Sequence, residues 1–198
     1  MIARIGNIDG PHAGQRVLTA GEALHQAESD GRPGGQRAGR RAMVMLHGRG
    51  GMAENILDVA ALIQQPGFVY LAPQAAGNTW YPNYFLAPLE SNEPALSSAL
   101  AAVGDLLAQL ETAGIPPEHT ILMGFSQGAC LALEYAARNA RRYGGVAALS
   151  GGLIGPDGTP RDYAGSLAGT PVFLGCSDVD PHIPLARVRA SAEVMRRL

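Results

Sequence analysis

The sequence predicts an α/β protein in which helices cover both faces of a mostly parallel β-sheet. Short apolar runs, typical of buried parallel strands, alternate along the chain with longer segments of helical spacing. The chain has 198 residues, of which 46% are apolar and 16% charged. That composition suits one packed core and is too apolar for a disordered chain. We therefore expect a single domain spanning residues 1–198.

The first 40 residues have an irregular pattern. A short strand at 15–18 and a short helix at 20–27 are the only regular elements that they suggest. The stretch 29–40 is rich in Gly and Arg, which predicts a solvated loop. A phosphate-binding loop is the weaker interpretation, because no strand precedes this stretch and no Gly-Lys-Ser/Thr follows it.

The strands of the sheet are predicted from five apolar runs. They lie at residues 42–46, 68–72, 119–124, 145–149 and 171–175. Each run has four to eight residues and is bounded by Gly, Pro or polar residues, as buried strands are. Residues 73–92 contain no clear element, and a loop of that length in a compact domain is usually functional.

Four segments with helical spacing separate or follow these strands. They lie at residues 53–64, 94–113, 127–140 and 185–198. The second begins at Pro94, with Ser91 or Asn92 as the expected N-cap, and stops at Gly114. Residues 151–169 are a Gly- and Pro-rich loop.

Composition also excludes several function classes. The net charge of −2 predicts no basic face for nucleic acid. Cys130 and Cys176 sit in apolar runs and are expected to be buried free thiols, neither a disulfide scaffold nor a zinc site. The N-terminus lacks a signal-peptide pattern, and no run reaches the roughly 18 apolar residues of a membrane span. We expect a cytoplasmic protein without metal or cofactor.

The strongest motif is Gly124-Phe125-Ser126-Gln127-Gly128, which matches Gly-x-Ser-x-Gly. It stands between a predicted strand and a predicted helix, the setting of a nucleophile elbow. The glycines would be needed because a Cβ two residues either side of the serine would clash with neighbouring backbone. The alternative is an ordinary serine in a glycine-containing turn.

Two further motifs follow predicted strands. Leu46-His47-Gly48-Arg49-Gly50-Gly51 is a glycine-rich loop that could turn a backbone N–H towards an oxyanion, with the N–H of Gln127 as the second donor. His47 is expected to hold that loop by hydrogen bonds, and a phosphate nest is the weaker interpretation. Residues 177–184 offer two aspartates, Asp178 and Asp180, as an acid or merely as turn caps.

Together these motifs resemble the phospholipase/carboxylesterase family of small serine hydrolases, which includes acyl-protein thioesterases. The family's Leu-His-Gly-x-Gly, Gly-Phe-Ser-Gln-Gly and Trp-(Phe/Tyr) motifs match this chain, the last at Trp80-Tyr81. Its Asp-Pro-x-Val-Pro motif matches residues 180–184, with Ile183 in place of Val. The resemblance covers residue 42 to the end and implies an α/β-hydrolase fold.

The same resemblance implies roles for particular residues. Ser126 would be the nucleophile and Asp180 the acid. The backbone N–H groups of Arg49 and Gln127 would form the oxyanion hole. Trp80-Tyr81 would line the substrate site.

The histidine base of the family has no clear counterpart in this chain. The histidines are His12, His25, His47, His119 and His182. Only His182 follows Ser126 and Asp180 in the family's order. It stands two residues from the acid, too close for the acid to hold its Nδ1–H while Nε2 reaches the serine. We expect the last strand and the histidine loop to lie beyond Leu198, and no histidine nitrogen to bond Ser126.

Two functions remain open from the sequence. The first is a carboxylic-ester hydrolase that cleaves small to medium esters or thioesters through an acyl-enzyme. The second is a binding module with the same fold that has lost turnover, for which the missing histidine is the only support. No other partner than a small-molecule ester is implied, and the oligomeric state is open.

Overall fold

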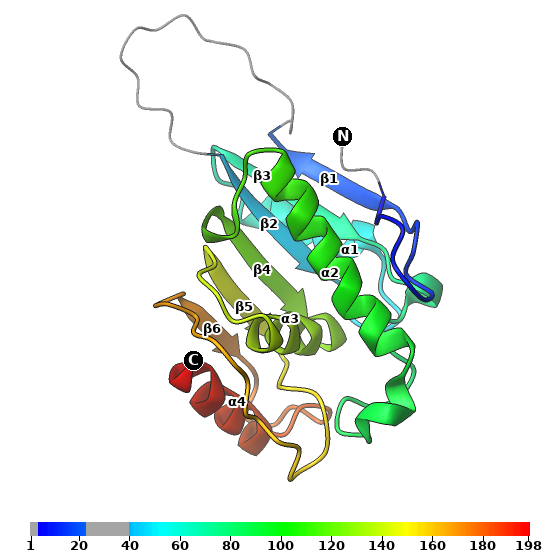
Figure 1. Ribbon diagram of the computed structural model, residues 1–198, viewed down its shortest axis with the longest axis vertical. Helices are drawn as coiled ribbons and strands as arrows, with labels where there is room; N and C mark the ends of the chain where they lie inside the picture. The colour runs from blue at the N-terminus through cyan, green and yellow to red at the C-terminus, as the bar shows by residue number, and fades with distance from the viewer. Residues whose placement is uncertain (1–3, 23–39) are drawn as a thin grey trace, which may run out of the picture.

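The computed structural model describes residues 4–22 and 40–198. Within them, one six-stranded sheet has the order β1-β3-β2-β4-β5-β6 (Figure 1). Its strands are β1 (Val17–Gly21), β2 (Arg41–Leu46), β3 (Phe68–Pro73), β4 (Thr120–Phe125), β5 (Gly145–Leu149) and β6 (Val172–Gly175). The edge strand β1 pairs antiparallel with β3, and every other pair is parallel. The expected α/β-hydrolase fold with a mostly parallel sheet is thereby confirmed.

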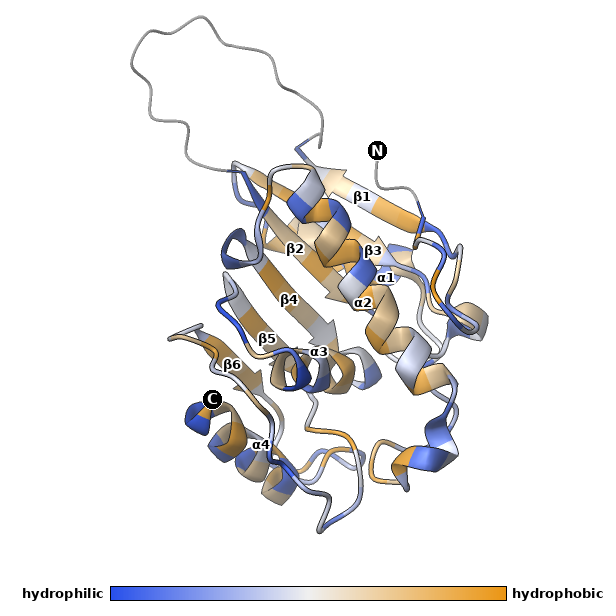
Figure 2. Cartoon of the chain, in the orientation of Figure 1, coloured by the Kyte–Doolittle hydropathy of each residue, from blue (hydrophilic) through white to orange (hydrophobic). Residues whose placement is uncertain are grey.

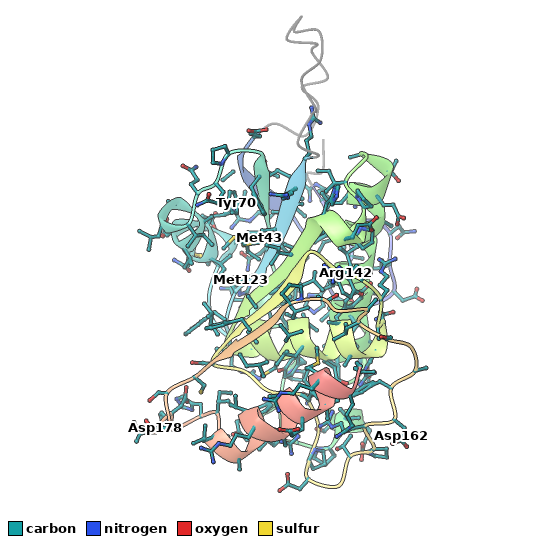
Figure 3. The ribbon with its side chains drawn as sticks, turned by 90° about the vertical axis from the view of Figure 1, so that its left-hand side faces the viewer. Met43, Tyr70, Met123, Arg142, Asp162 and Asp178 are labelled. Carbon is teal, nitrogen blue, oxygen red and sulfur yellow. The ribbon has the colours of Figure 1, made fainter. Side chains whose placement is uncertain are left out.

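Helices cover both faces of the sheet, as expected. They are α1 (Ala53–Leu62), α2 (Ala95–Thr112), α3 (Gln127–Arg138) and α4 (Leu185–Arg197). The face under α1 carries Met45, Tyr70 and Met123, and Figure 3 shows Met43, Tyr70 and Met123 on that side, opposite Arg142. The main core lies on the other face, beneath α2 and α3. None of the helices in the described ranges is long and apolar enough to cross a membrane.

The hydropathy of the elements agrees with these layers. The central strands are apolar along most of their length, while polar residues gather on the outer sides of the helices and in the loops (Figure 2). Val44 and Leu122 are fully buried on the α2–α3 face. Burial on both faces explains why these strands read as continuous apolar runs instead of alternating ones.

The N-terminal segment differs from expectation. Part of it is regular, because Val17–Gly21 forms β1, two residues later than the expected strand at 15–18. The expected helix at 20–27 is wrong at its start, since Ala20 and Gly21 belong to that strand and Glu22 lies in a bend. Its residues 23–27, and residues 29–39 of the loop expected at 29–40, lie outside the described residues. Antiparallel pairing along β3 determines this strand, and no local pattern encodes that pairing.

The α2 N-terminus also differs from expectation. Neither Ser91 nor Asn92 caps the helix, because both belong to a 3-10 turn and Pro94 occupies the cap position. Asn92 instead accepts a hydrogen bond from the backbone N–H of Asn83 at 2.8 Å. The side chain of Glu93 accepts one from the N–H of Ser97 at 3.0 Å, which satisfies a free donor of the first helical turn.

The register of the parallel strands brings the ends of four elements together. Leu46 lies opposite Gly124, Phe125 opposite Leu149, and Leu149 opposite Gly175. The loops that follow β2, β4, β5 and β6 therefore leave the sheet at one edge. Ligand sites of open α/β sheets form at this carboxyl edge.

Glu134 is a buried charge that ties α3 to the loop between β5 and β6. Its carboxylate accepts hydrogen bonds from Arg138 Nε at 2.7 Å, from Tyr163 Oη at 3.0 Å and from the backbone N–H of Ile154 at 3.0 Å. Arg161 lies 3.4 Å away as a second cation. A buried carboxylate is tolerated only when paired and hydrogen-bonded in this way.

Removing this carboxylate should destabilise the protein strongly. Glu134→Ala leaves Arg161 and the N–H of Ile154 without their acceptor, and breaking a buried pair in this way costs about 3–5 kcal/mol. Urea unfolding measures the change. Asp162→Ala, at an exposed position of the same loop, is the control and should change stability by less than about 0.5 kcal/mol. A loss below about 1 kcal/mol for Glu134→Ala would contradict this role.

Candidate active site

Ser126 stands on a strained turn between β4 and α3. Its φ of 53° and ψ of −118° lie in a region that residues with a side chain rarely adopt. The backbone N–H of Ser126 donates to Leu149 at 2.8 Å and its carbonyl accepts from Cys130 at 3.0 Å. These bonds to β5 and within α3 hold the strained residue in place.

The two glycines of the motif are required by close backbone packing. A Cβ on Gly124 would overlap the carbonyl of Gly128, and one on Gly128 would overlap the carbonyl of Leu46 and lie 2.6 Å from that of His47. The helix therefore approaches the strands more closely than any side chain would permit. This is the steric reason that the motif predicted.

The loop after β2 lies directly beside Ser126. A Cβ on Gly48 would come within 3.4 Å of Ser126 Cβ. Gly50 is fixed by a bond from its N–H to the carbonyl of Asn78 at 2.7 Å. Within the described part of the chain, the backbone N–H groups of Arg49 and Gln127 donate to no protein acceptor. They remain available to a ligand next to the serine.

A cavity of about 270 Å³ opens at Ser126. It is lined by Arg49, Tyr81, Tyr84, Phe85, Ser126, Gln127, Cys130, His182 and Ile183. Ser126, Arg49, Gln127 and Tyr81, four of the residues singled out from the sequence, thus meet at one site. The walls are largely apolar and aromatic, which is typical of a pocket for a small organic ligand.

Cys130 lies at the buried side of this cavity, and its thiol is expected to be unreactive. Burial raises the pKa of its thiol to about 12, so the thiol stays protonated at neutral pH. Burial likewise raises the pKa of the neighbouring Tyr81 hydroxyl.

Both cysteines are free thiols, but the expectation that both are buried is wrong for Cys176, which is only partly buried at the end of β6. A four-residue strand at the edge of the sheet leaves that thiol partly uncovered.

Trp80 does not line the cavity, so the structure does not support its expected place in the substrate site. The side chain is fully buried. Its Nε1 donates to the carbonyl of His47 at 2.8 Å, and its backbone N–H donates to the Gln127 side chain at 2.9 Å. The two neighbouring aromatic residues therefore differ in role. Tyr81 lines the cavity, while the Trp80 side chain packs against the loop after β2.

Asp180 lies in the turn after β6, next to two residues of the cavity wall. Its Oδ1 accepts from the backbone N–H groups of His182 at 2.8 Å and Ile183 at 3.0 Å. These bonds hold the pKa of the Asp180 carboxyl below its ordinary value. Its Oδ2 lies 3.6 Å from the thiol of Cys176. Asp178 is exposed.

No histidine among the described residues hydrogen-bonds to Ser126 Oγ. His12 and His47 use both ring nitrogens in bonds to backbone groups, and His119 is exposed in the turn that precedes β4. His182 lines the cavity, yet Asp180 bonds its backbone N–H and not its ring. His12 is the residue that the sequence did not reveal, because its contacts with Ala76 and Trp80 span more than 60 positions.

The fold and the strand–turn–helix at Ser126 define a protein of the α/β-hydrolase fold. Within residues 4–22 and 40–198, no group of three or more His, Cys, Asp or Glu side chains is arranged to hold a metal ion. The sequence profile of the phospholipase/carboxylesterase family matches residues 34–198. The chain belongs to this family.

Individual relatives agree with that assignment. Acyl-protein thioesterase 1 of Saccharomyces cerevisiae is 30% identical over an alignment of 167 positions, and the alignment covers 74% of this chain and 73% of that protein. The crystal structure of a phospholipase/carboxylesterase from Dyadobacter fermentans is 42% identical with a TM-score of 0.83, covering 93% of this chain and 82% of that one. Acyl-protein thioesterase 2 of Zea mays, 18% identical with a TM-score of 0.63, shares the fold over 92% of this chain and 84% of its own. The family and these relatives support a hydrolase function of the esterase class.

The close packing at the elbow should be intolerant of a single methyl group. Gly128→Ala forces α3 away from the carbonyls of Leu46 and His47, at a cost of at least about 3 kcal/mol, the upper end for overpacking. The matched control is Gly104→Ala in α2, where the added Cβ meets only the tip of Tyr135 at 3.3 Å and helix propensity improves. Denaturant midpoints of the two variants should move in opposite directions. Equal midpoints would show that the elbow has room to relax.

Proposed function

We propose that the protein is a serine carboxylic-ester hydrolase that cleaves small to medium esters or thioesters through an acyl-enzyme. The observation that carries this proposal is the placement of Ser126. It is held at a strained turn, at the wall of an apolar cavity, beside the free N–H groups of Arg49 and Gln127. A binding module would have no need of a strained serine next to two unused donors.

The proposed reaction has two halves. Ser126 Oγ attacks the acyl carbon and gives its proton to a histidine base, while the N–H groups of Arg49 and Gln127 stabilise the oxyanion. The base then protonates the leaving alcohol or thiol, which departs as the acyl-enzyme forms. Water attacks that ester by the same route, and the acid and free Ser126 result.

Asp180 would orient the base in this scheme. Its carboxylate is ionised at neutral pH and lies beside the cavity wall, ready to accept the Nδ1–H of an imidazole. Because no histidine of the described residues bonds to Ser126, we assign the base to a histidine outside them. His182 would remain a wall residue.

The size and chemistry of the cavity support the substrate class. About 270 Å³ lies just below the range of ~300–1,000 Å³ usual for pockets of drug-sized ligands. Tyr84, Phe85 and Ile183 offer apolar contacts to an acyl chain or a leaving group. The relatives that are named acyl-protein thioesterases make thioesters a reasonable second class beside oxygen esters.

The nucleophile can be identified by covalent labelling. A fluorophosphonate probe should attach to Ser126, and mass spectrometry of the digested protein locates the adduct. Ser126→Ala should abolish labelling and p-nitrophenyl ester hydrolysis with a melting temperature within a few degrees, because it removes one hydroxyl. Ser97→Ala, at an exposed serine of α2, should change neither. An adduct at another serine, or no adduct in protein that cleaves the p-nitrophenyl ester, would exclude Ser126 as the nucleophile.

The two aspartates after β6 should differ sharply. Asp180→Asn keeps the shape of the side chain but favours the wrong imidazole tautomer, so kcat should fall by about 10²- to 10⁴-fold. Asp178→Asn changes an exposed carboxylate and should alter kcat by less than about threefold, since exposed charges interact weakly. Steady-state kinetics with one p-nitrophenyl ester compares them. A larger loss for Asp178→Asn would exclude Asp180 as the acid.

A further inference from the structure

The only tryptophan of the chain lies between two histidines. The ring centroids of His12 and Trp80 are 5.4 Å apart, and those of His47 and Trp80 are 5.1 Å apart. All three side chains are buried. They come from segments far apart in the sequence: the stretch before β1, the loop after β2 and the loop after β3.

Each histidine uses both ring nitrogens, one as donor and one as acceptor. His12 Nε2 donates to the carbonyl of Trp80 at 3.0 Å, and His12 Nδ1 accepts from the N–H of Ala76 at 3.1 Å. His47 has the opposite tautomer: Nδ1 donates to the carbonyl of Gly48 at 2.8 Å, and Nε2 accepts from the N–H of Ala75 at 3.1 Å. Because a backbone N–H can only donate, both rings must be neutral.

Trp80 connects these histidines to the elbow. Its backbone N–H donates to Gln127 Oε1 at 2.9 Å, and Gln127 Nε2 donates to the carbonyl of Tyr81 at 2.7 Å. Its ring Nε1 donates to the carbonyl of His47, the oxygen that Gly128 also faces closely. One continuous set of bonds thus runs from His12, through Trp80, to the residue that carries one of the two free N–H groups.

His12 is itself anchored from outside the site. Its backbone N–H donates to Ser98 Oγ on α2 at 3.1 Å. Its ring then reaches across to the turn that contains Ala76 and Trp80. The stretch before β1 therefore connects α2 to the loop after β3, at the carboxyl edge of the sheet where the candidate active site lies.

We propose that His12 and His47 are positioning residues that hold Trp80 between them and so fix the N–H groups of Arg49 and Gln127 at the geometry needed for an oxyanion. We call the three side chains His12, Trp80 and His47 the clamp. The catalytic part of this inference rests on the function proposed above, while the clamp itself can be tested without any substrate.

The clamp should open in acid. Burial lowers the pKa of His12 and of His47 below 6.5, more than their bonds to the Trp80 and Gly48 carbonyls raise it. Folding therefore favours the neutral rings: their contribution to stability is complete above pH 6.5 and is lost as the pH falls through the lower native pKa values. Protonation of His47 Nε2 would place its new N–H opposite the backbone N–H of Ala75, and protonation of His12 Nδ1 would do the same opposite Ala76. Two donors would then face each other, and both hydrogen bonds would be lost.

Few charged groups act on this pair. His12 opposes protonation of His47 by repulsion, and Glu54 of α1 favours protonation of His47. Glu54 is paired with Arg16, which precedes β1. On the α2 side His12 meets Ser98, which does not titrate.

Trp80 fluorescence reports the state of the clamp. An imidazolium in contact with an indole quenches its emission, whereas a neutral imidazole does so far less. In Ser126→Ala protein, emission should fall reversibly as the pH is lowered from 8, with a midpoint below 6.5. His12→Gln should diminish the quenching step, because an amide can make the same two bonds without titrating. His119→Gln, at an exposed histidine, should leave the curve unchanged.

Catalysis tests the positioning role in otherwise native protein. His12→Ala should lower kcat by about 10- to 100-fold with little change in KM, since small displacements of oxyanion donors affect the transition state most. His12→Gln should restore most of that loss, which a purely steric role would not explain. Melting temperatures of both variants identify the pH range in which each is folded, and kinetics are measured there.

Two results would overturn the inference. One is a fluorescence curve that His12→Gln leaves unchanged, which would show that His12 does not titrate against Trp80. The other is folded His12→Ala protein with wild-type kcat. A protein that carries the assigned histidine base and still cleaves no ester would overturn the proposed function instead, and the fluorescence titration would still decide whether the clamp exists.

Discussion

The packing of Gly128 against the carbonyls of Leu46 and His47 is the contact on which the rest of the carboxyl edge depends. It allows α3 to begin directly above β2 and β4, so that the strained Ser126 stands at the edge itself. Any side chain there would lift the helix and separate the serine from the loop after β2. Because this separation is absent, the loop that carries the free N–H of Arg49 lies beside Ser126, and Arg49 and Gln127 line the same cavity. Strand register then adds the turn after β6 to the same edge.

Much of this arrangement could be predicted from the sequence. The five parallel strands lie within two residues of their expected bounds, because each is a short apolar run bounded by Gly, Pro or polar residues. Burial on both faces holds for the central strands, whereas the edge strand β6 exposes Phe173. The elbow and the loop after β2 could be placed because glycine spacing reflects a local steric need. The edge strand β1 could not be placed so well, since its partner β3 lies some 50 residues further along and edge strands carry a weaker apolar pattern.

Within the site, the limit of sequence reasoning is the direction of a side chain. A Trp-Tyr pair in a long loop indicates aromatic walls, yet adjacent residues point to different sides of the backbone. Tyr81 therefore reaches the cavity, and Trp80 is directed into the polar network behind it. The sequence pattern does not show which hydrogen-bond acceptor the Trp80 side chain will find. A buried indole N–H requires such an acceptor, and the carbonyl of His47 accepts this bond. Burial of Trp80 follows from that bond.

Histidine shows the same limit in its sharpest form. A histidine in a hydrolase sequence suggests a base, but a base needs one ring nitrogen free to take a proton from the nucleophile. In His12 and His47 both nitrogens are committed to backbone groups, and burial keeps the rings neutral. Such a ring is a rigid bridge between a donor and an acceptor that lie on opposite sides of the imidazole. Because lysine, arginine and carboxylates each offer only donors or only acceptors when ionised, neutral histidine suits the joining of two buried loops. A neutral imidazole has one nitrogen that donates a hydrogen bond and one that accepts, and this pair of nitrogens also allows histidine to act as a base in other sites. Here it lets His12 and His47 join two loops, as long as the pH stays above the pKa values of their rings.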